Sequence, residues 1–475
     1  MKTHMVRKNR RALGIWQMVM VILVMISAGA LALADDADRI QPYRENPFYW
    51  QYKGQPVLLL GGGDDDNLFQ WEQAELTAQL DTLIACGGNY VRNTMSDRDA
   101  GNLYAFARVG DWYDLGRWNE EYWQRFKSFL RLAAERDIIV QIELWDMWDL
   151  TRDNWARHPF NPLNNVNYTA AESGLLTEVP FNPAEEPTKH NFFHTVPDLE
   201  NNVRVLRFQQ AFIDRVLEVS LPFPNVLYCI NNESGEPPEW SRYWAKRIHR
   251  RAKERGVNAQ VTDMRRRVDI THATHRTVYD DTEVYTFADV SQNTGNQMRD
   301  HELQYRRLLE VREYLASAPR PINNVKIYRA DDRALQIFWR NLFAGCAATR
   351  FHRPYPASSN GGWGLTPTAQ TTFGSARMLM DRFDLFASKP RNDLLSDRSS
   401  NEAYCLAKAG KQYAVYFPDG GAVKLDVSEA KGPLQVRWLD VRRRAWQDSH
   451  TVEGGGILGL KTPGTSHWAV LVLDR

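Results

Sequence analysis

The sequence predicts a (β/α)₈ barrel followed by a small antiparallel β-sandwich. Between residues 56 and 386, short buried strand-like runs alternate with segments that have the apolar spacing of helices. From about Leu395 the pattern changes to short alternating runs separated by turn signals such as Asp419-Gly420-Gly421. The chain has 475 residues, which is long enough for one large and one small domain.

Eight β-prone segments support the barrel. Helical patterns separate most of them, for example at 71–86 and 122–136, and Gly87-Gly88 ends the first of these helices. Alternating strands and helices are typical of a parallel sheet or barrel. The expected strands are 56–60, 89–92, 138–144, 225–230, 259–262, 284–290, 321–327 and 347–352. Residues 151–199, rich in Asn, Pro and aromatic side chains, are expected to form a long loop that builds a lid or a subsite.

The first 34 residues have the features of a signal peptide. A basic start that contains Lys2 and Arg7 precedes an apolar run, and Ala32-Leu33-Ala34 provides a cleavage site. We therefore expect domains at 1–34 (signal peptide), 35–394 (barrel) and 395–475 (sandwich), and a secreted or periplasmic protein. The chain would contact a membrane only if the apolar run stays uncleaved as an anchor.

Composition argues against several classes of function. The formal net charge is +1, and cleavage at residue 34 removes five positive charges and no acidic residue, which leaves −4. This balance gives no electrostatic case for nucleic acid. The four cysteines are far apart in sequence and are expected to be buried. His158, His190 and His194 fit no ligand spacing, so neither a metal nor a cofactor is expected.

The stretch 225–235 organises the rest of the chain. Val226 to Ile230 is apolar and β-prone, and the polar residues Asn231, Asn232 and Glu233 follow it directly. In parallel barrels the chemistry lies at the carboxyl ends of the strands, so Glu233 is a candidate general acid. The alternative is that Glu233 caps a helix that begins near Pro238.

Polar residues follow most of the other predicted strands as well. Any one of them is more often structural than catalytic, but all should point to the same rim of the barrel. The set comprises Asp65, Asn67, Arg92, Asp146, Trp148, Asp289, His352 and, in the loop after the last strand, Trp363.

These features resemble known families. Asn232-Glu233 at the end of strand four and Arg92 on strand two resemble the barrel glycosidases of clan GH-A, whose acid/base Glu follows an Asn. The opening Asn46-Pro-Phe and Gly54-Gln-Pro-Val-Leu-Leu-Leu-Gly resembles the apiosidase-like branch. The last 80 or so residues, with Tyr413-Ala-Val-Tyr-Phe-Pro and Trp468, resemble a domain labelled as the collagen-binding domain of a collagenase. We do not infer collagen binding from that label.

One position departs from the clan. Strand seven should end in the nucleophilic Glu about five residues after a Pro, and Lys326 stands there, after Pro321. Four explanations remain open. The nucleophile comes from Asp289, Asp146 or Asp331; the enzyme inverts, with a second carboxylate activating water; the barrel binds sugar without cleaving it; or the strand is placed in the wrong register. A lysine on the rim could also pair with an acidic sugar or hold Glu233 ionised.

We therefore expect an exported glycoside hydrolase that cleaves a polysaccharide or its side chains. Its catalytic residues would be Glu233 as general acid/base, with Asp289 and Asp146. The substrate-binding residues would be Asp65, Asn67, Arg92, Trp148, Asn232, Lys326, His352 and Trp363. The alternative is a non-catalytic carbohydrate-binding or surface-adhesion protein, because of Lys326. The sugar, the linkage and the oligomeric state stay open.

Overall fold

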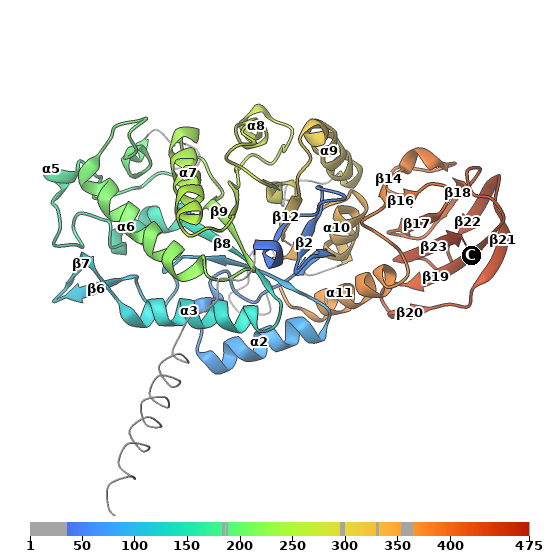
Figure 1. The fold of residues 1–475 in the computed structure, drawn as a ribbon, viewed down its shortest axis with the longest axis horizontal. Helices are drawn as coiled ribbons and strands as arrows, with labels where there is room; N and C mark the ends of the chain where they lie inside the picture. The colour runs from blue at the N-terminus through green and yellow to red at the C-terminus, as the bar shows by residue number, and fades with distance from the viewer. Residues whose placement is uncertain are drawn as a thin grey trace, which may run out of the picture.

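The computed structural model describes residues 36–182, 186, 189–294, 300–328, 332–352 and 364–474. Eight parallel strands form a nearly closed barrel with helices around it, which confirms the predicted fold class (Figure 1). Neighbouring strands follow the order β10-β9-β8-β5-β4-β13-β12-β11. Their bounds in chain order are β4 Leu59–Gly61, β5 Tyr90–Thr94, β8 Ile139–Asp146, β9 Val226–Asn232, β10 Gln260–Thr262, β11 Ala288–Asp289, β12 Ile322–Ile327 and β13 Ala348–Phe351.

The seam of the barrel lies between β10 and β11. The predicted strand 284–290 contributes only two residues to the ladder. Thr286 explains the difference, because its hydroxyl accepts from the Val261 amide at 2.8 Å and its amide donates to the Val261 carbonyl at 2.8 Å. The Thr262 hydroxyl donates to the Phe287 carbonyl at 2.8 Å. These hydrogen bonds, and not a continuous strand ladder, close the barrel between β10 and β11.

The surrounding helices bury apolar faces against the strands. Helix α3, for example, buries Tyr122, Phe126 and Phe129. Gly87 and Gly256 follow α2 and α7 with positive φ, as glycine does where a helix must stop. The helix bounds are α2 Gln73–Ala85, α3 Glu120–Ala134, α6 Val203–Ser220, α7 Pro238–Glu254, α8 Ala273–Tyr279, α9 His301–Tyr314, α10 Asp332–Phe343 and α11 Pro367–Met380.

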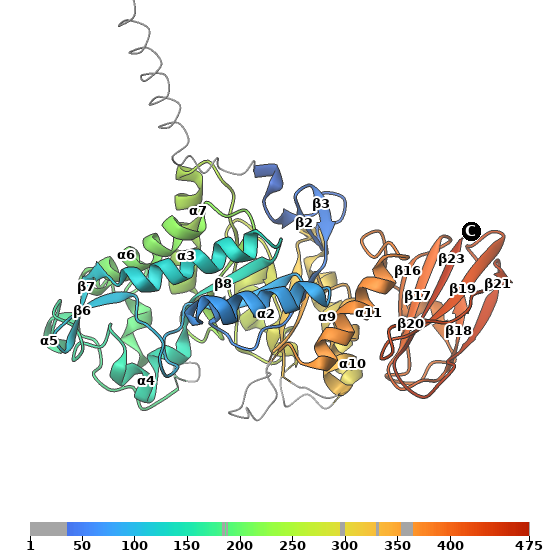
Figure 2. The ribbon, with the colours of Figure 1, turned by 90° about the horizontal axis from the view of Figure 1, so that it is seen from below.

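Loops at the carboxyl ends of the strands carry additional structure. A hairpin that sequence analysis did not predict follows β5, with strands β6 Phe106–Val109 and β7 Trp112–Trp118. The expected long loop after β8 contains the short helices α4 Arg152–Arg157 and α5 Ala170–Ser173. Figure 2 shows the hairpin, α4 and α5 at the same end of the molecule, far from the C-terminal sheets. At the opposite end of the strands, a small sheet (β1 Gln41–Pro42, β2 Trp50–Tyr52, β3 Gln55–Val57) packs Trp50 against the barrel.

The C-terminal part consists of two antiparallel sheets, as predicted. The larger contains β14 Lys389–Pro390, β16 Tyr404–Lys408, β17 Gln412–Phe417, β19 Pro433–Asp440, β20 Ala445–Trp446, β21 His450–Glu453 and β23 Trp468–Asp474. The smaller contains β15 Leu395–Ser396, β18 Ala422–Asp426 and β22 Ile457–Lys461. One hydrophobic cluster contains side chains of both sheets, including Val415 and Leu425. All four cysteines of the chain are buried and free of disulfides, as expected.

Helices α9 and α10 join the barrel to the larger C-terminal sheet. Trp339 stacks on Tyr416 with ring centroids 5.2 Å apart. The carboxylate of Glu302 accepts two hydrogen bonds from Arg398, at 2.7 and 2.8 Å, and a third from the Tyr404 hydroxyl at 3.2 Å. Because this pair is largely buried, it ties the two parts together more firmly than an exposed ion pair would.

The predicted signal peptide, residues 1–34, lies outside the described residues. None of the helices that the structure describes is long and apolar enough to cross a membrane. Export and the domain boundaries therefore stay predictions.

Replacing Glu302 with Gln should loosen the contact between the barrel and the C-terminal sheets. The variant leaves the largely buried Arg398 without its carboxylate, which we expect to cost about 1–3 kcal/mol of unfolding free energy. Thermal unfolding of the full chain measures the change. Glu310→Gln, an exposed position on the same helix, is the control. Equal melting temperatures for both variants would contradict a stabilising role for Glu302.

Candidate functional site

Glu233 lies immediately after β9, where the chain turns sharply. Its φ is +62°, in the left-handed region that a residue with a side chain seldom adopts. Two backbone hydrogen bonds hold the turn: the Ser234 amide donates to the Met264 carbonyl at 2.6 Å, and the Arg266 amide donates to the Ser234 carbonyl at 3.1 Å. The side chain of Glu233 is 12% exposed, so it faces a nearly closed space.

Three side chains from two other strand ends converge on the Glu233 carboxylate. The Lys326 ammonium on β12 donates to Oε1 at 2.7 Å, and the Tyr328 hydroxyl donates to the same oxygen at 3.0 Å. The Trp148 indole NH donates to Oε2 at 3.3 Å. Lys326 also donates to Oδ1 of Asn232 at 2.5 Å. Lys326 therefore faces Glu233 across the barrel, and the register assumed for strand seven is correct.

The ion pair decides the charge of Glu233. Burial alone would raise the pKa of this carboxyl, but the positive charge of Lys326 and the hydrogen bonds from Lys326 and Tyr328 hold it well below its usual range. Glu233 is therefore a carboxylate at neutral pH. A general acid must carry a proton before reaction, so the resting site has Glu233 in the form that suits a base or a nucleophile.

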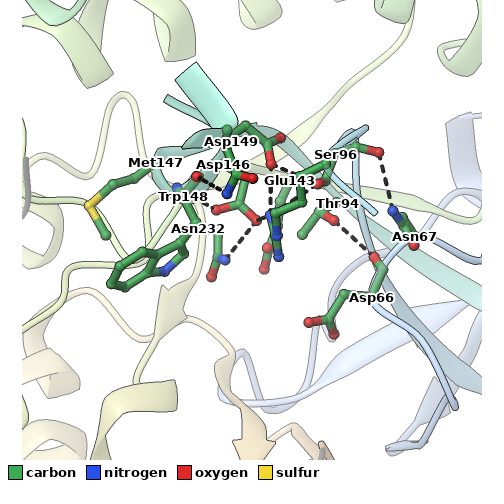
Figure 3. Close-up of polar contacts among 12 residues, drawn as sticks. Asp66, Asn67, Thr94, Ser96, Glu143, Asp146, Met147, Trp148, Asp149 and Asn232 are labelled. Atoms are coloured by element: carbon green, nitrogen blue, oxygen red, sulfur yellow. Dashed lines mark hydrogen bonds and ion pairs between the residues drawn. The ribbon is translucent and has the colours of Figure 1, made fainter. Parts of the chain in front are cut away.

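A second group of polar residues adjoins this site through Asn232 (Figure 3). Asn232 donates to Oδ2 of Asp146 at 3.1 Å, and Arg98 donates to the same oxygen at 2.5 Å. Arg98 also donates to Asp149 at 2.8 Å, as does the Ser96 hydroxyl. Burial raises the pKa of Asp149 to about 7, although Arg98 opposes the shift. Asp149 is therefore more easily protonated than an ordinary aspartate.

A third group lies deeper in the barrel, around Arg92. Its guanidinium pairs with Glu143 through two hydrogen bonds of 2.5 Å and with Asp66 at 2.6 Å. His352 lies 3.3 Å from Asp66, but burial lowers its pKa to about 3, so it is neutral. Arg92 and His352 therefore share Asp66, and both are almost completely buried. Both side chains therefore bond to other buried residues inside the barrel.

The other predicted residues make different contacts. Asp289 accepts from the Ser291 amide at 2.9 Å and from Gln141 at 3.2 Å inside the barrel, and burial raises its pKa. Asp65 accepts from the Trp71 indole at 2.8 Å, and Asn67 donates to the Ser96 carbonyl at 3.2 Å. Asp65 thus stabilises its own loop, and Asn67 ties that loop to the one after β5. Trp363 and Asp331 lie outside the described residues.

A buried network under the turn replaces the predicted helix cap. Glu236 accepts from Asn231 at 3.0 Å and from the hydroxyls of Ser234 and Ser241 at 2.8 Å each. Helix α7 begins after Pro237, which makes no side-chain cap. The alternative that Glu233 caps this helix is therefore wrong, since its carboxylate bonds to Lys326, Tyr328 and Trp148.

Sequence analysis did not predict several of these site residues. Tyr328 could have been predicted, because residues two apart on an extended chain point to the same side and Lys326 is expected on the rim. Arg98 and Glu236 could not, since they lie in loops without a recognisable motif. Across the part of the chain that the structure describes, no group of three or more His, Cys, Asp or Glu side chains is arranged to hold a metal ion.

Comparisons with known proteins identify the kind of barrel. Residues 98–292 match a family described only as a domain of unknown function, DUF6298. No curated protein matches the sequence. A solved structure named "Glycoside hydrolase" is 12% identical, with a TM-score of 0.63, over 92% of this chain and 97% of its own. A glycoside hydrolase family 5 protein from Bacteroides vulgatus is 14% identical, with a TM-score of 0.64, over 92% and 93% of the two chains.

A family 5 mannosidase from Rhizomucor miehei is also similar, at 12% identity and a TM-score of 0.50, over 71% of this chain and 96% of its own. At these identities the likeness shows the fold alone. The chain shares its TIM-barrel fold with these glycoside hydrolases, and this is the fold that the resemblance to clan GH-A implied. The apiosidase-like and collagen-binding assignments stay predictions.

Removing the Lys326 charge should destabilise the protein in a pH-dependent way. In Lys326→Met, burial of Glu233 is no longer opposed by the cation, so its pKa rises above the unfolded value of about 4.3. Stability is then lost as pH rises through the new pKa. We expect a cost of about 3–5 kcal/mol near neutral pH and a smaller one near pH 4.5.

Urea unfolding at the two pH values measures both costs. The double variant Lys326→Met/Glu233→Gln removes both charges and should recover most of the loss near neutral pH. A cost that is the same at both pH values, or a double variant no more stable than Lys326→Met, would mean that the ion pair does not hold the charge of Glu233.

Proposed function

We propose that the protein is a glycoside hydrolase that cleaves an oligo- or polysaccharide, with Glu233 as its essential carboxylate. The observation that carries the proposal is the position of Glu233 at the end of β9, after Asn232, with its charge held by Lys326. The glycoside-hydrolase fold supports this reading. A carboxylate at this end of the barrel strands is where such chemistry takes place.

The ion pair changes the role expected for Glu233. Lysine cannot form a glycosyl ester, so Lys326 cannot replace the missing nucleophile. An ionised Glu233 can attack the anomeric carbon itself or activate a water molecule, and the leaving oxygen then needs a proton from another group. Asp149 suits that task chemically, because its pKa of about 7 makes it half protonated at neutral pH. Arg98 and Asp146 connect Asp149 to Asn232 by hydrogen bonds, and Lys326 connects Asn232 to Glu233.

The identity of Lys326 also favours a second candidate function, binding without cleavage. The same cation that fixes Glu233 neutralises the group that would react. A barrel that had lost its nucleophile would keep its sugar-binding shape and would still bind saccharides. Measurement of turnover decides between the two.

Two further proposals concern localisation and substrate. The basic and apolar character of residues 1–34 supports export to the periplasm or the outside of the cell. Among the substrates, mannosides come first in any panel, because one of the similar structures is named a mannosidase.

Glu233→Gln should abolish glycosidase activity while it leaves sugar binding intact. We expect turnover to fall by about 1,000-fold or more, because a positioned carboxylate contributes that much to such reactions. The assay uses residues 35–475 on aryl glycosides and on mannan, glucan and xylan, and Glu239→Gln, an exposed position on α7, is the control. NMR of the first-formed anomer shows whether the enzyme inverts or retains.

Equal activity of the wild-type protein and Glu233→Gln would reject Glu233 as the reacting carboxylate. A wild-type protein that binds these sugars but releases no product would instead favour the non-catalytic alternative.

A further inference from the structure

Two loops at one end of the barrel form a wall that the proposed reaction does not use. The hairpin β6–β7 packs along residues 161–167: the Tyr113 amide donates to the Asn164 carbonyl at 2.8 Å, and the Val166 amide donates to the Tyr113 carbonyl at 3.0 Å. Asn167 reinforces the contact, since its amide group bonds to the Leu115 amide at 2.7 Å and to Asp114 at 3.0 Å. These four hydrogen bonds join the two loops.

Two hollows lie against this wall and share part of their lining. One has a volume of about 350 Å³ and the other about 500 Å³, and Asn102, Tyr104, Arg108 and Tyr113 line both. Volumes of about 300–1,000 Å³ are typical of sites for small molecules. Because the hollows share these four residues, they lie side by side, and we call the two together the hairpin groove.

The lining of the hairpin groove combines aromatic rings with hydrogen-bonding groups. The rings of Tyr104 and Tyr113 lie 5.1 Å apart, and the guanidinium of Arg108 lies 4.8 Å from the centre of the Tyr113 ring. Aromatic faces flanked by polar groups suit a sugar ring, which has an apolar face and a rim of hydroxyls. Four acidic residues and three arginines line the two hollows, so the groove has little excess charge and favours a neutral ligand.

The hairpin groove also connects with the candidate catalytic site. Asp97 lines both the smaller hollow and the inner cavity that contains Asp146 and Asp149. Arg98, on the groove side, bonds directly to Asp146 at 2.5 Å, and Asp146 accepts from Asn232, the residue before Glu233. A sugar chain that reacts at Glu233 and extends past Asn232, Asp146 and Arg98 would enter the groove.

We propose that the hairpin groove binds the distal units of a neutral oligosaccharide, which makes the protein selective for long chains. This proposal rests on the proposed function for the position of the reacting bond, but its test does not require turnover. Tyr104, half-buried between the two hollows, is the residue that should contact the sugar. Loss of its ring should weaken the binding of long substrates and leave short ones unaffected.

Binding is measured by calorimetry on full-length protein that carries Glu233→Gln, so that cleavage does not interfere. The probes are mannohexaose, cellohexaose and xylohexaose, the matching disaccharides, and an acidic hexamer of galacturonic acid. At least one neutral hexasaccharide should bind about 10-fold or more tightly than its disaccharide. Tyr104→Ala should remove that advantage, whereas Trp112→Ala, a 50% exposed ring on the same hairpin, should not.

Arg108→Gln, at an exposed position, provides a second variant should Tyr104→Ala fail to fold. The proposal is overturned if no neutral hexasaccharide binds, if di- and hexasaccharides bind equally, if the acidic hexamer binds best, or if Tyr104→Ala weakens both lengths alike. A protein that binds hexasaccharide through Tyr104 but never cleaves it would refute the proposed hydrolase and leave the groove assignment standing.

Discussion

The ion pair between Lys326 and Glu233 is the interaction on which the site depends. Both side chains are nearly buried, and the positive charge of Lys326 keeps Glu233 ionised there. Lys326 also binds Asn232, so one ammonium group fixes both residues at the end of β9. The left-handed backbone at Glu233 is tolerated because this contact and the hydrogen bonds of Ser234 hold the turn from both sides.

Buried charge elsewhere in the barrel is also paired. Arg92 joins Glu143 and Asp66, and Arg98 joins Asp146 and Asp149. These pairs form successive layers from the barrel interior to the mouth, and the outermost pair meets the loops of the hairpin groove. A change at Arg98 would therefore affect both the catalytic side and the groove side of Asp146, which makes the site a single network.

Sequence analysis was most accurate where a feature depends on residues close together in the chain. A β-prone run that ended in Asn232 and Glu233, and the distance of Lys326 from Pro321, placed both members of the ion pair correctly on the rim. Their partnership was only one of several readings of Lys326, because a contact between β9 and β12 leaves no pattern in either segment. The expected role of Glu233 as general acid/base stays a prediction, and the ion pair favours its ionised form. The hairpin 106–118 was missed because its strands are short and largely exposed, so the apolar alternation is weak.

The charge of Glu233 in the free protein is the quantity that tests this account most directly. Carbon-13 NMR of protein labelled at glutamate carboxyls can follow it, with the resonance assigned by its loss in Glu233→Gln. The account predicts an ionised carboxylate from about pH 8 down to about pH 4, with no titration near the ordinary glutamate value of about 4.3 or above it. A titration midpoint near pH 6 or higher would contradict the account, since Glu233 would then be the protonated general acid of an ordinary glycosidase and Lys326 would not control it.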